Sequence, residues 1–179
     1  MKIAIFCSAN DKIDPDFFKE TAHLGRRCAE EGHTIVFGGT NQGLMDCVAK
    51  AAHEAGGQVV GIVPTIIEKG GHSSAYMDID IPCVNLSDRK ELMNAQCDIA
   101  VALPGGIGTL DEIFTLAASA TIGYHNKRVV LFNIKGFWDA LLHLLDHLQA
   151  QGMIRGNYRQ TIVVANNVDE FFQLLQQTD

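Results

Sequence analysis

The 179-residue sequence lacks several features that mark other classes of protein. It contains no run of lysines or arginines, and its formal net charge is −7, so we expect neither a nucleic-acid polymer nor an anionic membrane surface as a partner. No apolar run approaches the length of a membrane span. No linker or low-complexity stretch divides the chain, so we expect a single domain over residues 1–179.

Paired cysteines are also lacking. The chain has five cysteines, an odd number, and none of them forms a Cys-x-x-Cys motif, which favours reduced thiols over a disulfide framework. The first residues already have a strand pattern and lack the features of a signal peptide, so we expect a cytoplasmic protein. Cys7 ends this first strand without a base nearby in the sequence. It is therefore interpreted as part of a core or pocket wall and not as a nucleophile.

Short apolar segments alternate with helical patterns along the whole chain. The predicted strands are residues 2–7, 33–37, 58–63, 82–85, 97–103, 128–132 and 161–164. The predicted helices include 15–31, which Asp14 caps, 87–94, which Ser87 caps, 137–150 and 168–176. Residues 64–80 have little periodicity and are expected to form a lid or binding loop. The alternation predicts a single-domain α/β fold, a Rossmann-like doubly wound parallel sheet with helices on both faces.

The most informative segment follows the predicted strand 97–103. Pro104-Gly105-Gly106-Ile107-Gly108 leads from this buried strand into a helix. Glycines allow a ligand to approach the backbone closely, and the free amides at the start of a helix favour an anion such as phosphate. Glu112 follows within the expected first turn, and a phosphate and a carboxylate in one pocket indicate a reaction.

A purely structural reading of the same residues stands beside this one. Thr109 and Glu112 have the spacing of a capping box, in which each side chain accepts a hydrogen bond from the backbone amide near the other. The structural and catalytic roles do not exclude each other.

A second glycine turn, Gly38-Gly39-Thr40-Asn41-Gln42-Gly43, follows the predicted strand 33–37. It matches neither the dinucleotide fingerprint nor the phosphate loop of nucleoside triphosphatases. In a doubly wound sheet both glycine turns lie at the carboxyl ends of strands, so they can share one pocket. Arg89 and Lys90 emerge at the same edge and can contact a phosphate there; the alternative for this pair is a solvated helix start.

Two histidines, His143 and His147, are spaced one helical turn apart and could bind a metal. Leucines at positions 141, 142, 144, 145 and 148 mark the expected buried stripe of this helix and leave both histidines outside it. We therefore expect a solvated face and no metal site.

Several of these motifs together resemble the LONELY GUY family, the cytokinin riboside 5'-monophosphate phosphoribohydrolases, long described as possible lysine decarboxylases. The resemblance rests on Arg89-Lys90-x-x-Met93 followed by Pro104-Gly105-Gly106-x-Gly108-Thr109-x-x-Glu112, and it covers nearly the whole chain. It implies hydrolysis of the N-glycosidic bond of a nucleoside 5'-monophosphate to the free base and ribose 5-phosphate. The substrate would be a cytokinin riboside 5'-monophosphate or a plain purine nucleotide such as AMP.

The resemblance also implies roles for particular residues. Arg89 and Glu112 would be catalytic. The helix dipole favours the ionised form of Glu112, which would hold the ribose hydroxyls or activate water, and Arg89 would steady the substrate or the departing base. Gly105, Gly106, Gly108 and Thr109 would hold the 5'-phosphate. The remaining expected substrate contacts are Cys7, Gly38, Gly39, Gly43, Met45, Lys90 and Pro104. No cofactor is implied.

Members of the family are dimers or larger, so a homo-oligomer is expected. The apolar helix after Glu112 would form its interface, through Ile113, Phe114, Leu116, Ala117 and Ala120.

The sequence departs from the family at positions that affect substrate choice. Ser87-Asp88 replaces the common Met-His, Ser119 and Thr121 replace a Trp-x-Gln pair, and Thr40 replaces a glycine. The reaction type is therefore better supported than a prenylated-adenine specificity. An alternative function comes from a second resemblance, to molybdenum-cofactor carrier proteins, which bind a phosphorylated pterin without turning it over. A non-catalytic carrier or sensor of a nucleotide or pterin is thus the other candidate.

Overall fold

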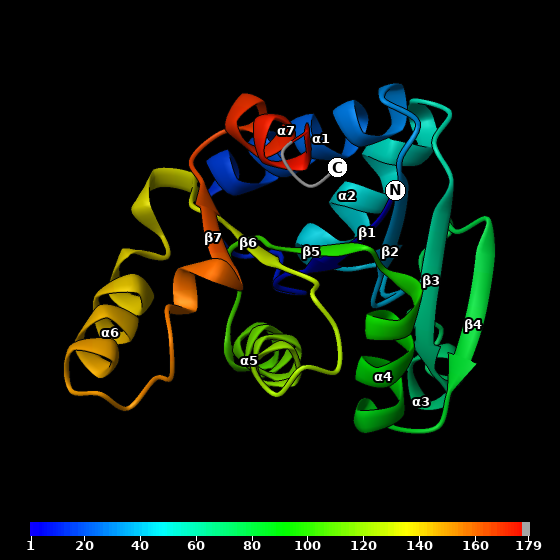
Figure 1. Ribbon diagram of the computed structural model, residues 1–179. Coiled ribbons are helices and arrows are strands. Elements are labelled where there is room, and N and C mark those ends of the chain that lie inside the picture. Colours follow the sequence, from blue (N-terminus) through cyan, green and yellow to red (C-terminus); the bar gives the residue numbers. More distant parts are fainter. Residues whose placement is uncertain (177–179) are drawn as a thin grey trace.

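The computed structural model describes residues 1–176 and consists of one seven-stranded, all-parallel sheet between two layers of helices (Figure 1). The strand order is β4-β3-β2-β1-β5-β6-β7. The strands are β1 (Lys2–Phe6), β2 (Thr34–Phe37), β3 (Val59–Pro64), β4 (Ile79–Cys83), β5 (Ile99–Ala102), β6 (Val129–Phe132) and β7 (Ile162–Ala165). The predicted doubly wound parallel fold is confirmed.

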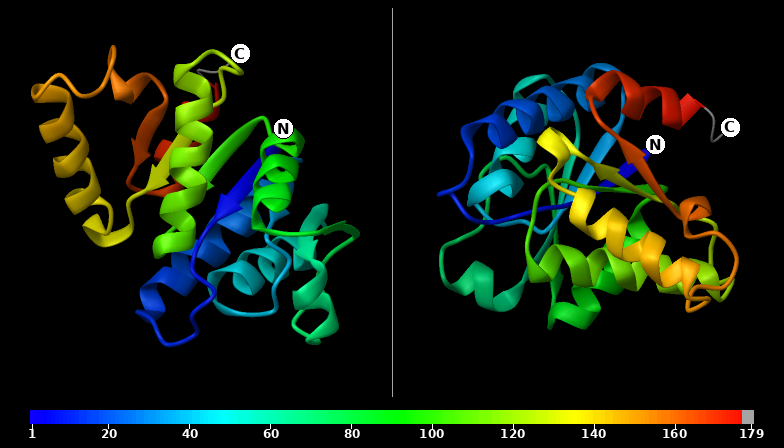
Figure 2. Two further views of the ribbon diagram at one scale, coloured as in Figure 1. Left: turned by 90° about the horizontal axis from the view of Figure 1, so that it is seen from below. Right: turned by 90° about the vertical axis from the view of Figure 1, so that its left-hand side faces the viewer.

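The helices cover both faces of the sheet. Helices α1 (Pro15–Glu30), α2 (Gly43–Glu54) and α7 (Val168–Gln176) lie on one face, and α4 (Leu86–Gln96), α5 (Ile107–Thr121) and α6 (Asp139–Ala150) lie on the other (Figures 1 and 2). As expected, Asp14 caps α1, its carboxylate accepting a hydrogen bond from the Asp16 amide, and Pro15 occupies the first turn. The fold therefore has three layers, with the sheet between two layers of helices.

Each face of the sheet contributes to its own hydrophobic cluster. Ile3 and Ile5 of β1 pack in the cluster beneath α1, α2 and α7, whereas Ala4 and Phe6 pack in the cluster beneath α4 and α5. Because both faces are buried, the central strands are apolar throughout instead of alternating with polar residues. This is why the strands were recognisable as short continuous apolar runs.

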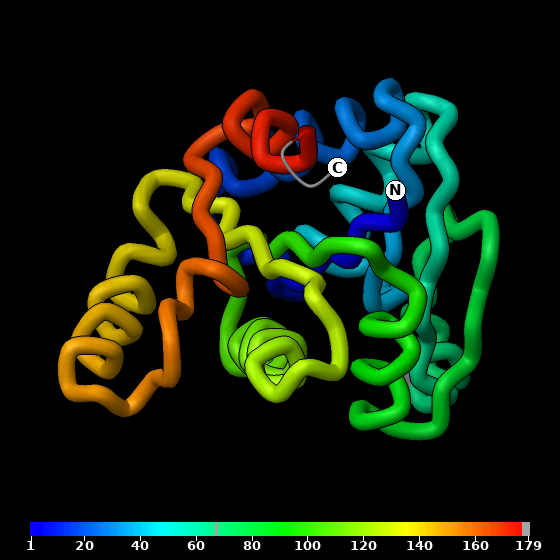
Figure 3. The backbone as a smooth tube through the Cα atoms, in the orientation of Figure 1, coloured from blue at the N-terminus to red at the C-terminus, as the bar shows by residue number. Residues whose placement is uncertain are grey.

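The chain direction across the sheet reverses between β1 and β5. The chain builds β1 to β4 towards one edge, then α4 carries it back so that β5 pairs with the other side of β1 (Figure 3). Just beyond these strands the Ser8 amide donates to the Pro104 carbonyl over 3.1 Å. Such a switch point is where ligands bind in open α/β sheets.

The segment 64–80 differs from its expected loop. Residues Thr65–Lys69 form a short helix, α3, and strand β4 begins at Ile79 instead of residue 82. β4 is an edge strand with largely exposed residues, so it lacks the continuous apolar pattern of the inner strands. Its true start was therefore not visible in the sequence.

Two predicted helix starts were wrong. Asn85, not Ser87, caps α4, because the Asn85 side chain accepts hydrogen bonds from the amides of Ser87 and Asp88. Helix α5 begins at Ile107 after Gly106, with no side-chain cap, so Thr109 and Glu112 do not form a capping box. Glu112 instead lies in the second turn and bonds to another helix.

The stripe expected on helix α6 is narrower than predicted. Leu145 is buried, but Leu144 is 51% exposed, because α6 lies towards the β7 side of the sheet, where fewer elements cover it (Figure 1). His143 and His147 are both exposed, as expected. Across residues 1–176, the structure contains no helix that combines the length and apolar character needed to cross a bilayer.

Candidate functional site

A cavity of about 240 Å³ opens at the carboxyl ends of β1 and β5. Seven of its lining residues are among those expected to form the site: Cys7, Met45, Arg89, Gly106, Gly108, Thr109 and Glu112. They come from the end of β1, from the first turn of α2, from α4 and from the glycine turn with the first two turns of α5. The switch point therefore brings together residues that are up to 105 positions apart in the chain.

The glycine turn after β5 leaves the N-terminus of α5 open. A Cβ atom on Gly106 or Gly108 would meet no atom within 4 Å, so both residues present bare backbone to the cavity. Gly105 instead leaves room for the Thr109 side chain, because a Cβ atom on Gly105 would lie 2.0 Å from the Thr109 hydroxyl. With no side chain capping α5, its first amides and the positive end of its dipole are available to an anion.

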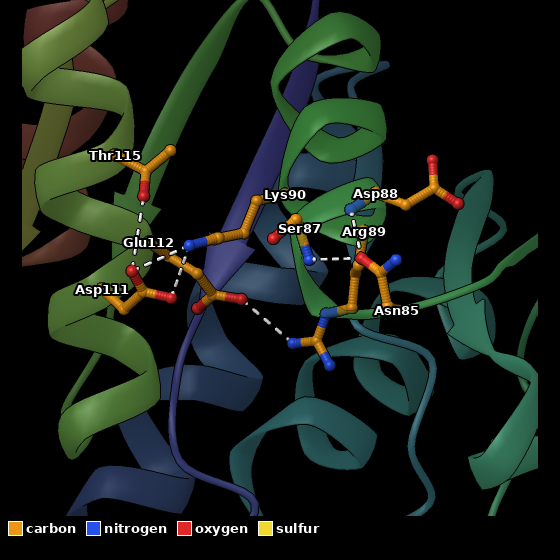
Figure 4. A network of polar contacts seen from close by, with 8 residues as sticks. All are labelled: Asn85, Ser87, Asp88, Arg89, Lys90, Asp111, Glu112 and Thr115. Carbon is orange, nitrogen blue, oxygen red and sulfur yellow. Dashed lines mark hydrogen bonds and ion pairs between the residues drawn. The ribbon is translucent and has the colours of Figure 1, made fainter.

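Arg89 and Glu112 form an ion pair on the wall of this cavity (Figure 4). The Arg89 Nη2 atom donates to the Glu112 Oε1 atom over 3.0 Å. The two side chains are only 14% and 7% exposed, respectively. A carboxylate is thus held, largely away from bulk water, beside an open helix N-terminus.

Burial and the arginine act on Glu112 in opposite directions. Desolvation is the larger effect and raises the pKa of the Glu112 carboxyl above its ordinary value, while the charge and hydrogen bond of Arg89 lower it. Glu112 sits in the second turn of α5, and its burial there is the largest of these effects on its pKa.

Lys90 does not line the cavity. Its ammonium group contacts both oxygens of Asp111, at 2.8 and 2.7 Å, and its side chain is 20% exposed. Two consecutive residues of α4 therefore pair with two consecutive residues of α5, Arg89 with Glu112 and Lys90 with Asp111 (Figure 4).

The second glycine turn lies mostly beneath neighbouring loops. The Gly43 amide donates to the Asp11 carboxylate over 2.8 Å, and a Cβ atom on Gly43 would lie 2.5 Å from the backbone of Ala9. A Cβ atom on Gly39 would lie 2.4 Å from the Val63 side chain. The structure does not bring Gly39 or Gly43 to the cavity, whereas Gly38 lies directly beneath the Arg89 guanidinium.

Ser8 and Ala9 also line the cavity and were not singled out as contacts in the sequence. Their position in the sequence could have identified them, because they directly follow β1, the central strand at the switch point. Pro104 is buried, and its carbonyl accepts a hydrogen bond from the Ser8 amide.

The Cys7 thiol is buried at the floor of the site. Desolvation raises the pKa of Cys7 well above its ordinary value, and the nearby Glu112 carboxylate raises it further. A thiol with a raised pKa stays protonated, which fits a cavity wall and not a nucleophile. Across residues 1–176 no group of three His, Cys, Asp or Glu side chains is placed to hold a metal ion.

The fold and the site define a Rossmann-like α/β protein with an open helix N-terminus and a buried carboxylate at its switch point. The family model described as "Possible lysine decarboxylase" matches residues 45–175, and the chain belongs to this family. It is 33% identical over 176 residues to cytokinin riboside 5'-monophosphate phosphoribohydrolase LOG5 of Arabidopsis thaliana, covering 98% of this chain and 77% of that protein. The resemblance to the LONELY GUY family is confirmed.

Solved structures support the same fold. The structural-genomics target TM1055 superposes with a TM-score of 0.78 at 26% identity, covering 98% of both chains. A molybdenum cofactor carrier protein from Chlamydomonas reinhardtii superposes with a TM-score of 0.76 at 24% identity, over 98% of this chain and 96% of that one. At that identity the second likeness concerns the fold alone.

Proposed function

We propose that this protein hydrolyses the N-glycosidic bond of a nucleoside 5'-monophosphate, releasing the base and ribose 5-phosphate. The observation that carries the proposal is the buried Glu112–Arg89 pair in the same cavity as the uncapped N-terminus of α5. A phosphate needs the open amides, and an N-glycosidic cleavage needs an anionic group nearby. A pure phosphate cradle would have no use for a buried carboxylate.

In this proposal the glycine turn, Glu112 and Arg89 have different roles in the reaction. The amides of Gly106 and Gly108 and the Thr109 hydroxyl bind the 5'-phosphate at the helix N-terminus. The Glu112 carboxylate stabilises the positive charge that develops on the ribose as the bond to the base breaks, or it orients the attacking water. Arg89 keeps Glu112 ionised against desolvation and steadies the departing base.

The name of the LOG5 relative suggests a cytokinin riboside 5'-monophosphate as substrate. The positions that depart from the family weaken that inference for this chain. The hydroxyls of Ser119 and Thr121 bond to carbonyls of their own helix, and the Asp88 carboxylate accepts from the Val84 amide. None of the three offers a large apolar surface to a prenyl group, so we propose a plain purine nucleotide such as AMP as an equally suitable substrate.

The test uses the unmodified protein and a panel of AMP, GMP, CMP, UMP and isopentenyl-AMP, together with their nucleosides. Free base and ribose 5-phosphate are followed by chromatography. We expect release from at least one monophosphate and from none of the nucleosides, because the helix N-terminus recognises the phosphate. Release from nucleosides at the same rate would contradict the proposed role of the glycine turn.

A carrier or sensor is the second candidate, supported by the shared fold of the molybdenum cofactor carrier proteins. It predicts stoichiometric binding without product. Calorimetry with the same panel decides between the two, since tight binding of a monophosphate without release of base would favour the carrier.

The homo-oligomer remains a prediction, but its expected interface needs correction. Ile113 and Leu116 are fully buried within this chain and are not available to a partner. Of the large apolar side chains on α5, Phe114 and Ile107 are exposed, at 40% and 88%. Of the residues predicted for the interface, Phe114 is therefore the large side chain that a partner could contact.

A further inference from the structure

The position of Gly38 is explained by Arg89. A Cβ atom on Gly38 would lie 2.7 Å from the Arg89 Nη2 atom, 2.9 Å from its Cζ atom and 3.1 Å from the Met45 sulfur. The first two distances are shorter than real Cβ atoms tolerate. Gly38 is not among the glycines with a positive φ, so its backbone conformation alone does not require glycine. The missing side chain leaves the space that the guanidinium occupies.

Helix α4, which carries Arg89, is also joined to α5 by a second ion pair. Lys90, the next residue of α4, holds both oxygens of Asp111 on α5, and the Thr115 hydroxyl lies 3.5 Å from one of these oxygens. This pair joins the two helices directly beside the Arg89–Glu112 pair, as Figure 4 shows. Two adjacent ion pairs therefore join α4 to α5.

We propose that Gly38, Lys90 and Asp111 are positioning residues that act through Arg89. Gly38 provides the space beneath the guanidinium, and the Lys90–Asp111 pair fixes α4 against α5 so that the guanidinium meets Glu112. The second glycine turn thus serves the site by seating an arginine and not by touching the ligand. The arrangement itself is independent of the reaction, and only its consequence for turnover rests on the proposed function.

The first experiment measures the Glu112 carboxyl directly by NMR. Protein labelled with ¹³C at the glutamate carboxyl carbons is titrated, and Glu112→Gln identifies the signal. Arg89 lowers the pKa of Glu112, so displacing the guanidinium should raise it. We expect Gly38→Ala and Arg89→Met each to raise the pKa of Glu112, and the double variant to raise it no further than Arg89→Met alone.

Asp111→Asn separates positioning from a simple effect of charge. The Asp111 carboxylate itself raises the pKa of Glu112, so loss of that charge alone would lower it. If Asp111 positions α4, its loss also weakens the larger influence of Arg89, and the pKa of Glu112 rises. A fall of the pKa in Asp111→Asn, or an unchanged pKa in Gly38→Ala, would overturn the proposal.

Two controls accompany these variants. The exchanged pair Lys90→Asp with Asp111→Lys keeps an ion pair between the helices and should return the pKa of Glu112 towards the wild-type value. Lys50→Met removes a lysine of the Lys50–Glu54 pair, whose side chains are 50% and 60% exposed and do not line the cavity, and should leave the pKa of Glu112 unchanged. Melting temperatures confirm that each variant is folded.

Kinetics complete the test where the wild-type protein is active. With a hydrolysed monophosphate, we expect Gly38→Ala to lower kcat about 10- to 100-fold, and no further effect when Arg89→Met is already present. An additive loss in the double variant would instead mean that Gly38 contacts the substrate. If no monophosphate is hydrolysed, the proposed function fails but the NMR experiment still decides whether Arg89 is seated as described.

Discussion

The chain contains two junctions in which a buried strand runs into glycines and then into a helix, and they serve different purposes. At the junction of β2 and α2, the Asp11 carboxylate accepts a hydrogen bond from the Gly43 amide, and the loop after β1 covers the turn. At the junction of β5 and α5, no side chain caps the helix, and Gly106 and Gly108 face a cavity. The first helix N-terminus is satisfied by the chain itself, whereas the second remains available for an external anion.

This difference shows that a glycine turn before a helix is not by itself a binding site. What decides is whether the chain supplies its own carboxylate to the helix N-terminus. Asp11 lies 32 residues before Gly43, so nothing in the local sequence of the turn reveals it.

The largest effect is expected from Glu112→Gln at the open junction. We expect turnover to fall about 1,000-fold or more, because a neutral amide does not stabilise a developing cation. The melting temperature should be equal to or above that of the wild type, since burial disfavours the charged carboxylate and glutamine can still accept from Arg89. Full activity in this variant would remove Glu112 from the mechanism.

Closing the open junction should abolish its function while strengthening the helix. Gly106→Asp would place a carboxylate where α5 has none; the φ at this position is negative (−101°), and a Cβ atom there would meet no atom within 4 Å. We expect the unfolding free energy to rise by about 0.5–1 kcal/mol and the affinity for AMP to fall at least about tenfold.

The matched control for this change is Gly106→Asn, which can cap α5 without adding charge. It should stabilise the helix similarly and weaken AMP binding less, as measured by calorimetry. Equal losses of affinity in both variants would indicate a steric effect and not repulsion of the phosphate.

The pH dependence should reflect the buried state of Glu112. Because burial raises the pKa of Glu112 above 4.5, the rate constant kcat/KM should fall as the pH drops through that raised value. Stability should show the opposite trend. The folded protein binds the Glu112 proton more tightly than the unfolded chain, so the free energy of unfolding decreases as the pH rises through this window.

Glu112→Gln provides the check for this pH dependence. Chemical denaturation across the acidic range should show a weaker decrease of stability with pH in the variant than in the wild type. An identical slope in both proteins would contradict the raised pKa.

The smallest effect is expected at the closed junction. Asp11→Ala removes the carboxylate that accepts a hydrogen bond from the Gly43 amide. The loss of this bond should lower the free energy of unfolding by about 1 kcal/mol. AMP binding should change less than about threefold, because α2 does not offer its N-terminus to the ligand. Asp11→Asn keeps an acceptor oxygen and should restore most of the stability. A large loss of binding in both variants would mean that the two junctions share the ligand after all.

Much of the fold was predictable because its strands are buried on both faces. The continuous apolar runs of β1 and β5 and the Asp14–Pro15 start of α1 identified the alternation correctly. The edge strand β4 was predicted three residues too late and the short helix α3 was not found, because neither segment carries a strong apolar period. Asn85 and Ser87 are both good caps, and only the backbone geometry selects Asn85.

The candidate site was predictable to a similar extent. The topology of a doubly wound sheet brought Arg89 and Glu112 to one edge, and the structure places them in contact. The partner of Lys90 was not predictable, because pairing with Asp111 depends on how α4 and α5 cross. The roles of Gly38, Gly39 and Gly43 were likewise hidden, since what a glycine faces is decided by residues distant in the sequence.

The paired charges on α4 and α5 also determine how an anion is recognised. Arg89 on the cavity wall is paired with Glu112, and Lys90 beside it is paired with Asp111, so neither side chain offers an unpaired positive charge to an anion. A phosphate would thus be held by backbone dipoles, whose field acts only at short range. At a distance, the ligand meets the repulsion of a chain with a net charge of −7. Dissolved salt, which screens that repulsion, should therefore accelerate the encounter instead of slowing it, the reverse of a site built from unpaired lysines.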